Sequence, residues 1–459
     1  MSILAQPQAV HAELTISAQD ERASVAIYRP FFLAGILSVL TAGCTLGAVA
    51  MLGIALKGSY TADVWTPYVL AHANSQLYGW VGFFVMGFAL QQHAPSKRKV
   101  KLFHQLAYAS LVLMAIGIGL RFAAEPLAQS NPSFWVPAGI FSCILQFVAV
   151  ALFMTNTQVT RHRTGQPLDW QGRFVLASLG WMFLISAAEP FMFAQAHQPD
   201  PIQSVMFVAK YFAPYRDAQF LGFVSLMIFG VALTKMSAFF GARPAHRDLA
   251  LTALLVWNMG LIGRMIGWVV YFDREMAPGT NRLYFAGGLL IAAAAVMLVI
   301  ALRIFEPLSE KLPAHKFIRS AFAWLLLGAG LLLLEPLHLA LIGQQFSHAY
   351  IGGLRHALTV GFISQMILGV GMHVVARMNA IPESAQKSLW TAFILLNLGN
   401  AARVALEIAT DYSPRGFLPM APTGFVELTG LAIWAWYTAK PMLRRRTTPA
   451  TAAVNIALG

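Results

Sequence analysis

The sequence predicts an all-helical membrane protein in which twelve transmembrane helices form three repeated units of four helices each. Three observations predict this fold: the composition, the apolar stretches and a spaced repeat. Hydrophobic residues make up 58% of the 459-residue chain and charged residues only 11%, and about 20 apolar residues span a bilayer. The net charge of +13 comes from Lys and Arg that lie mostly between the apolar stretches. This charge therefore orients the chain in a membrane and is no sign of nucleic-acid binding.

A set of four markers occurs three times with the same internal spacing. Two glycines eight residues apart are followed thirty residues later by a third, and four residues after that by an arginine. From Gly79 to Gly222 is 143 residues, and from Gly222 to Gly361 is 139. A period of this length predicts that one multi-helix unit has been tripled, and the glycines are expected to permit close helix packing. The three copies are Gly79, Gly87, Gly117 and Arg121; Gly222, Gly230, Gly260 and Arg264; and Gly361, Gly369, Gly399 and Arg403.

The elements follow in order from a polar leader, 1–28, which lacks the basic and apolar regions of a signal peptide. Four-helix units are expected at 29–172, 173–318 and 319–440, and a basic tail occupies 441–459. The twelve spans are predicted at 31–55, 68–91, 102–123, 134–155, 173–195, 214–238, 248–272, 283–304, 319–342, 351–376, 387–409 and 421–440.

Further residues support the division into units. Arg173 and Arg319 open the first span of the last two units, and Glu189 and Glu335 follow them by sixteen residues, each before a proline. The third span of the same two units carries an asparagine two residues before its glycine, at Asn258 and Asn397.

Loop charge predicts the topology, because cytoplasmic loops are rich in Lys and Arg. Every second loop is basic, as is the tail, so both termini are expected in the cytoplasm and the protein in the bacterial inner membrane. The basic residues are Lys97, Arg98, Lys99, Lys101, Arg161, Arg163, Arg243, Arg247, Lys311, Lys316, Lys387, Arg444, Arg445 and Arg446.

Two histidines are the main candidates for chemistry. His72 lies seven residues before the first glycine of its unit and His356 five before, so both should lie at similar depth near the outer surface. Ionisable side chains within a membrane are costly, which makes them functional candidates. Two neutral imidazoles that face each other at one depth are what a six-coordinate heme iron requires. The alternative is that each histidine only hydrogen-bonds a neighbouring helix.

The three repeated arginines, Arg121, Arg264 and Arg403, end the third span of each unit at the same outer surface. A buried guanidinium needs an acceptor such as a carboxylate. Heme propionates could provide it, which would make these arginines cofactor-binding residues. Glu125 and Glu407, one turn beyond Arg121 and Arg403, could provide it instead, and snorkelling to the surface is a further alternative.

The remaining histidines are weaker candidates. His338 and His348 flank the outer end of spans nine and ten and could bind a second iron or a copper. His373 lies seventeen residues after His356, about 25 Å along a helix, so it cannot share the same site.

Several segments resemble the NnrS family of bacterial membrane proteins: LAHANSQLYGWVGFFVMGFAL, GLRHALTVGFISQMILGVGM and LLNLGNAARVALE. The arrangement of three four-helix units also resembles the catalytic subunit of heme-copper oxidases. The resemblance covers most of the chain and implies an oxidase-like fold that binds heme and copper, connected with nitric oxide stress and denitrification. The first family motif is similar to His-Ala-His-Glu, whereas this chain has His72-Ala73-Asn74-Ser75 and lacks the second histidine.

The chain departs further from an active oxidase. Such enzymes resemble one another in a copper site built from histidines on spans six and seven, and here neither span contains one. Without imidazole or thiolate ligands copper is held poorly, so no complete binuclear site is visible and oxygen or nitric oxide reduction is not expected.

The sequence therefore predicts a protein that binds b-type heme, since no Cys-x-x-Cys-His attachment motif is present. Its expected partners are the lipid bilayer, nitric oxide as a gas ligand, and proteins of respiration or denitrification. Two other classes remain: a cofactor-free scaffold or assembly factor of a respiratory complex, and a transporter. The transporter is less favoured because substrate sites there lie near the midplane on broken helices.

Overall fold

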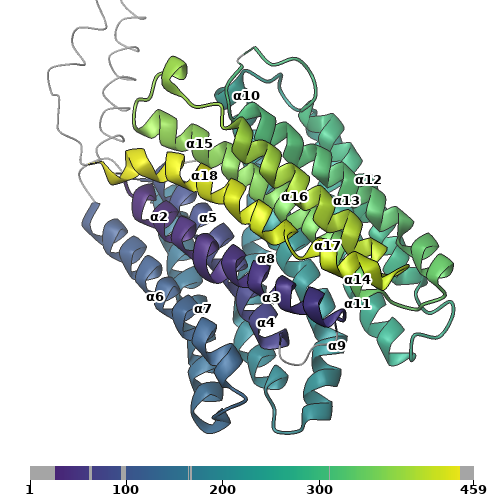
Figure 1. Ribbon diagram of the computed structural model, residues 1–459. Coiled ribbons are helices and arrows are strands. Elements are labelled where there is room, and N and C mark those ends of the chain that lie inside the picture. Colours follow the sequence, from purple (N-terminus) through teal and green to yellow (C-terminus); the bar gives the residue numbers. More distant parts are fainter. Residues whose placement is uncertain are drawn as a thin grey trace, which may run out of the picture.

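The computed structural model describes residues 26–60, 65–94, 100–163, 165, 168–309 and 311–444, and this part of the chain is a bundle of long helices without strands (Figure 1). Nearly all of the predicted leader and most of the tail lie outside the described residues.

The first half of the described chain forms long helices, three of which contain a π segment. Their bounds are α2 (Tyr28–Ser38), η1 (Val39–Gly43), α3 (Cys44–Lys57), α4 (Thr66–Asn74), η2 (Ser75–Gly82), α5 (Phe83–Gln92), α6 (Val100–Leu127), α7 (Pro132–Arg163), α8 (Gly172–Ala196), α9 (Pro201–Asp217), η4 (Ala218–Ser225) and α10 (Leu226–Phe240).

The second half continues in the same way. Its elements are α11 (Arg247–Asp273), α12 (Arg282–Leu302), α13 (His315–Ile342), α14 (His348–His356), η5 (Ala357–Ser364), α15 (Gln365–Met378), η6 (Glu383–Ala385), α16 (Trp390–Ala409), η7 (Pro414–Gly416), α17 (Phe417–Met420) and α18 (Thr423–Leu443).

Eleven helices of the described chain are long and apolar enough to cross a membrane, which confirms a polytopic membrane protein. They coincide with eleven of the twelve predicted spans. The other predicted span, 68–91, is helical as α4, η2 and α5 but is not among the eleven. Its first half carries polar residues such as His72, Asn74 and Gln76, which lower its mean hydropathy.

Two long helices form the interior of the bundle. In Pro201–Ser237 and His348–Met378, 67% of the most apolar stretch is buried, compared with 33–56% in the other candidate spans. Aromatic rings pack between these inner helices, since Phe229 stacks on Phe362 with centroids 5.7 Å apart. Trp80 of η2 meets Trp434 of α18 edge to face. The helix that contains η2 therefore joins the same core.

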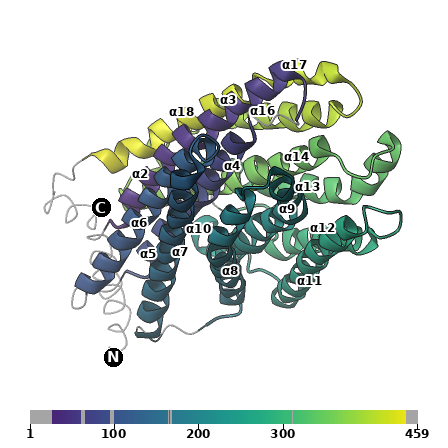
Figure 2. The ribbon, with the colours of Figure 1, turned by 90° about the horizontal axis from the view of Figure 1, so that it is seen from below.

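The first and last spans lie side by side. Figure 2 shows α2, α3, α16 and α18 along one side of the bundle, with α6 and α7 at one flank and α11 and α12 at the other. The Arg29 side chain near the start of α2 donates to Asn379 just after α15, at 2.8 Å. The last described helix, α18, packs against α2 and α3, the first long helix.

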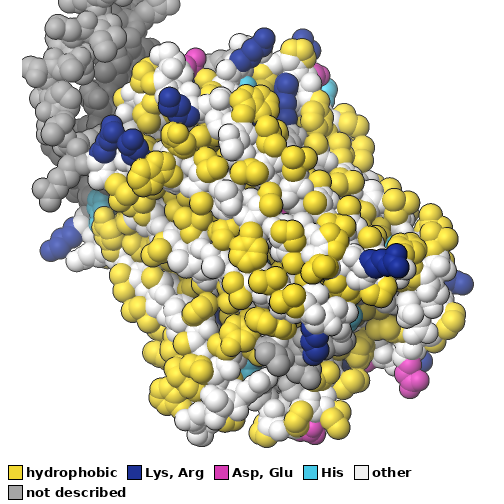
Figure 3. Space-filling model, in the orientation of Figure 1, with side chains coloured by type: hydrophobic (Ala, Val, Ile, Leu, Met, Phe, Trp, Pro, Cys, Tyr) yellow, Lys and Arg dark blue, Asp and Glu magenta, His cyan; other side chains and the backbone are white. Residues whose placement is uncertain are grey.

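Hydrophobic side chains cover most of the outer surface seen in Figure 3, and Lys and Arg gather near the ends of the bundle. Leu37 and Leu56 on the first long helix are 65% and 70% exposed, as expected for side chains that contact lipid. We call the end that holds Arg121, Arg264 and Arg403 the arginine end, and the opposite end, with Arg161 and Arg243, the basic-loop end.

Three π-helical segments occur at related places in the chain. Each of η2, η4 and η5 has eight residues, and each contains the first glycine of one predicted repeat. From Ser75 to Ala218 is 143 residues and from Ala218 to Ala357 is 139, the same spacings as those of the glycines. π-Helical turns are rare in proteins, and many of those that occur lie at functional sites. Their recurrence places one local distortion in each inner helix.

The repeated glycines lie at close helix contacts, which confirms their interpretation as packing residues. A Cβ atom at Gly222 would lie 2.8 Å from the Trp181 ring, and one at Gly361 would meet the Trp324 ring in the same way. The two tryptophans are also equivalent in their hydrogen bonds. Trp181 donates to Asn258 at 3.0 Å and Trp324 to Asn397 at 2.9 Å.

Candidate functional site

His72 lies near the end of α4, just before the π segment η2, and its ring faces the first long helix. Its Nδ1 is 2.8 Å from the carbonyl oxygen of Gly43, the last residue of η1. A carbonyl can only accept, so Nδ1 carries the proton and the lone pair of the neutral ring is on Nε2. Gly47 makes room for the ring, because a Cβ there would lie 2.6 Å from its Cε1 atom.

His356 ends α14, immediately before the π segment η5, and has the same tautomer. Its Nδ1 is 3.0 Å from the carbonyl oxygen of Gly352 and 3.5 Å from Oε2 of Glu407 on α16. Both of these atoms accept, so Nε2 of the neutral ring again has the lone pair. With its amide oriented to satisfy both neighbours, Asn400 donates to the carbonyl of His356 and accepts from the Gly361 N–H, each at 3.3 Å.

His72 and His356 each lie just before the π segment of their helix, and that they face each other across one metal site stays a prediction. Across the described residues, neither Nε2 atom has a hydrogen-bond partner. Metal-binding histidines usually donate their other N–H to a carbonyl or a carboxylate, and these two do so. The pair therefore fits imidazole ligation of a metal group.

The three repeated arginines are all buried and paired with protein groups. Arg121 of α6 contacts Glu125 at 2.6 Å and Glu189 of α8 at 3.4 Å. Arg264 of α11 contacts Asp217 at 3.2 Å and Glu335 of α13 at 3.0 Å.

Arg403 of α16 has a different environment. It contacts Glu407 of its own helix at 3.1 Å, and its Nη1 meets the sulfur of Met51 on α3. For all three arginines the described chain thus supplies an acceptor of its own, as the protein salt-bridge alternative expects.

His338 and His348 have different surroundings from those of His72 and His356. Nε2 of His338 is 2.7 Å from Asp411 and Nδ1 is 3.1 Å from the Tyr412 hydroxyl, so both nitrogens are engaged. His348 is exposed at the start of α14, with its ring edge-on to Phe346. Within the described ranges no three His, Cys, Asp or Glu side chains gather closely enough to hold a metal ion.

Some partners in the site were not foreseen from the sequence. Glu189 and Glu335 were recognised as repeat markers but not as partners of Arg121 and Arg264. Their position inside apolar spans was the available signal, since an intramembrane carboxylate requires a counter-charge. The contact of Met51 with Arg403 could not be predicted in this way, because a methionine in an apolar helix does not indicate a particular partner.

A separate cavity of about 420 Å³ opens at the basic-loop end. Apolar residues from several helices line it, among them Phe88, Val231 and Ile367, together with Arg161. Phe88 follows His72 by sixteen residues, about 24 Å along a helix. This cavity is therefore not part of the histidine site.

Fold and site together define the class: a polytopic helical membrane protein in which two histidines, His72 and His356, each have Nδ1 held by a backbone carbonyl. A model of the NnrS protein family matches residues 26–446, nearly the whole chain. The chain belongs to the NnrS family, which confirms the resemblance seen in the sequence. No curated protein matches the chain.

Proposed function

We propose that this NnrS family member is a heme-binding protein of the bacterial inner membrane that acts in the nitric oxide response or in denitrification. In this proposal His72 and His356 are the axial ligands of one b-type heme. The observation that carries the proposal is the shared tautomer: each Nδ1–H is held by a backbone carbonyl, and each Nε2 is left without a hydrogen-bond partner among the described residues. Family membership supports the connection with nitric oxide.

The residues around the pair have separate tasks in this proposal. The carbonyls of Gly43 and Gly352 fix the ring orientations and make Nε2 a better donor to a metal. Glu407 is 3.5 Å from His356 and 3.1 Å from Arg403, so it links the imidazole to a buried guanidinium. A bound heme would supply an iron centre able to exchange electrons, and nitric oxide could bind it only in place of one of the two imidazoles. Respiratory or denitrification proteins would then be the electron partners.

The oxidase-like architecture of twelve spans in three units is part of the same proposal. It is supported by the π segments η2, η4 and η5, which recur at the 143- and 139-residue spacings of the sequence repeat. It is also supported by the equivalent tryptophan–asparagine hydrogen bonds of α8 to α11 and α13 to α16. The helix α4–η2–α5 would be the twelfth span.

Heme content tests the proposal directly. Protein expressed with added heme precursor and purified in detergent should show a Soret band, and its pyridine hemochrome should be that of b-type heme. Folded full-length protein without iron or a Soret band would contradict the proposal and favour the cofactor-free scaffold.

The ligand pair is tested by substitution. His72→Ala and His356→Ala should each remove the low-spin bis-imidazole spectrum, and the double variant should be no worse than either single one, because the two residues act as a unit. His373→Ala is the matched control: it removes a buried histidine from the long helix that also carries His356, at the basic-loop end, and should leave the spectrum unchanged. A low-spin spectrum that persists in both single variants would refute the assignment.

The proposed topology places both termini in the cytoplasm. Reporter fusions at Gly459 and in the loop at Ser96 should report a cytoplasmic location, and a fusion at Asp200 a periplasmic one. Termini on opposite sides of the membrane would require an odd number of spans, which three units of four helices do not allow.

A further inference from the structure

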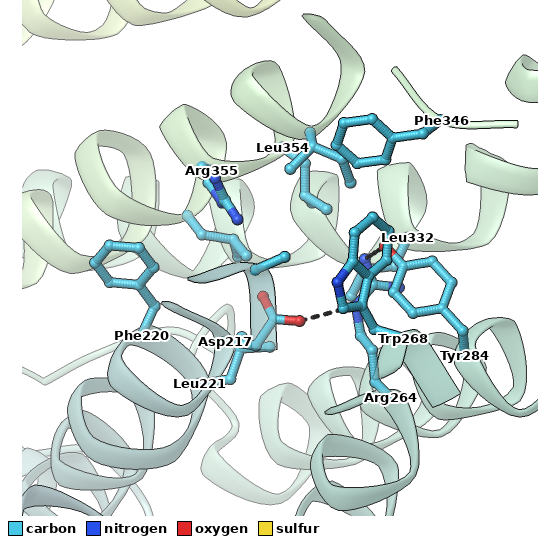
Figure 4. Close-up of a pocket in the computed structure, with 13 residues that line it drawn as sticks. Asp217, Phe220, Leu221, Arg264, Trp268, Tyr284, Leu332, Phe346, Leu354 and Arg355 are labelled. Carbon is cyan, nitrogen blue, oxygen red and sulfur yellow. Dashed lines mark hydrogen bonds and ion pairs between the residues drawn. The ribbon is translucent and has the colours of Figure 1, made fainter. Parts of the chain in front are cut away.

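A small cavity lies at the arginine end between η4, α11 and α14, away from the histidine pair. Its volume is about 20 Å³, enough for one water-sized occupant. Three charged residues line it, Asp217, Arg264 and Arg355, among aromatic and aliphatic side chains such as Trp268 and Phe346 (Figure 4). The cavity is therefore a mostly apolar space into which charged groups point from three helices.

Two guanidinium groups at this cavity have unsatisfied hydrogen-bond donors. Arg355 has no hydrogen bond or ion pair within the described residues, and its buried Nε has no acceptor. Arg264 is 2% exposed; it contacts Asp217 and Glu335, yet its Nη1 is buried without an acceptor. Native proteins rarely leave buried charged donors unpaired, since each loses its hydration without replacement. Figure 4 shows Arg355 facing Asp217, whose dashed contact goes to Arg264.

The surrounding charges leave one positive charge in excess. Two of the three charged residues that line the cavity, Arg264 and Arg355, are positive and only Asp217 is negative; Glu335, which contacts Arg264, does not line it. The guanidinium of Arg216 is bonded to the neutral amide of Gln219 at 2.7 Å. The next carboxylate, Glu407, is already paired with Arg403. A single negative charge would therefore balance the cluster.

We propose that this cavity binds one small inorganic monoanion, of the size of a halide ion, between the guanidinium groups of Arg355 and Arg264. The volume admits a compact ion and excludes an organic acid of several carbon atoms. Anions in apolar surroundings interact with the positive edges of aromatic rings, and Trp268 and Phe346 line the same space. The inference goes beyond the proposed heme function, because neither His72 nor His356 lines the cavity.

Bromide is a suitable probe for this site. Full-length protein in gluconate buffer should gain thermal stability as bromide replaces gluconate at constant ionic strength, and the gain should saturate. Arg355→Gln should abolish the saturable gain, whereas Arg274→Gln, at an exposed arginine of the same end, should retain it. In crystals grown with bromide, anomalous density should lie between Arg355 and Arg264. No saturable gain in the unaltered protein, or an equal gain in Arg355→Gln, would overturn the proposal.

Two further variants separate this anion from other occupants. Asp217→Asn removes the negative charge that competes with the ion, so bromide should saturate at a lower concentration; weaker binding would contradict the proposal. His72→Ala protein should respond to bromide as the unaltered protein does. A response that appears only in His72→Ala would mean that a heme carboxylate normally occupies the cavity, and the inorganic anion would be rejected.

Discussion

Three buried arginines at one end of the bundle have the same place in their helices but not the same partners. Arg121 reaches Glu189 on α8 and Arg264 reaches Glu335 on α13, so each joins two helices through an ion pair. Arg403 meets a methionine sulfur on α3 where the others meet a carboxylate. A thioether accepts hydrogen bonds only weakly. Arg121 and Arg264 are therefore each joined to a neighbouring helix by an ion pair, whereas Arg403 is joined to α3 only by a sulfur contact. We call these three contacts the arginine junctions.

The histidine pair lies at this third junction. His72 packs against Gly47 of α3, and His356 contacts Glu407 beside Arg403. The carboxylate of Glu407 is thus shared between Arg403 of its own helix and the His356 imidazole of α14. Glu125 at the first junction is likewise shared between Arg121 and the His197 imidazole, so what distinguishes the third junction is the missing carboxylate from a neighbouring helix.

The largest expected effect is on stability at the charged junctions. Arg264→Leu would leave Glu335, whose side chain is 2% exposed, without its counter-charge, and removal of one partner of a buried pair costs about 3–5 kcal/mol. Arg403→Leu should cost less, because only Glu407 loses its partner and His356 remains beside it. Thermal and denaturant unfolding in detergent, followed by tryptophan fluorescence, would measure both.

Arg274→Leu is the control for this comparison. Arg274 is exposed at the same end, so its removal should change stability by no more than about 0.5 kcal/mol. Equal losses in Arg264→Leu and Arg403→Leu would show that the junctions are equivalent after all.

A second prediction concerns the space for His72. Gly47→Ala would place a Cβ 2.6 Å from the imidazole, so the ring must turn away from the Gly43 carbonyl. Loss of such a supporting hydrogen bond weakens metal binding about 10–100-fold, and heme titration would measure the change. Gly330→Ala, where a Cβ meets nothing within 4 Å, is the matched control and should bind heme normally. Unchanged heme affinity in Gly47→Ala would show that the position of the His72 ring does not affect heme binding.

The smallest effect is expected from Met51→Leu. The two side chains have similar volumes, and such exchanges usually cost less than about 1.5 kcal/mol. Arg403 loses only a weak acceptor and keeps Glu407. If unfolding measurements gave a loss as large as that of Arg264→Leu, the sulfur contact would be a main support of this junction and the contrast with the other two would fail.

Much of the architecture could be predicted because it depends on local composition. Stretches of about 20 apolar residues specify membrane-spanning helices wherever they occur, and eleven of the predicted spans are found as such. The span at 68–91 is helical yet less apolar, since the polar residues that made His72 a candidate also lower its hydropathy. The glycine spacing likewise identified close helix contacts, because only a missing side chain permits them.

The sequence by itself therefore determined the membrane class, the helix positions, the spaced markers and the two histidines as candidates, all of which are properties of single segments. The tertiary structure alone decided which side chains meet. Whether Arg264 reaches Glu335, or Arg403 reaches Met51, depends on the rotation and depth of helices far apart in the chain. The tautomers of His72 and His356 likewise depend on carbonyls that the fold places beside each ring. Such contacts arise from packing between helices, and no spacing within one segment encodes them.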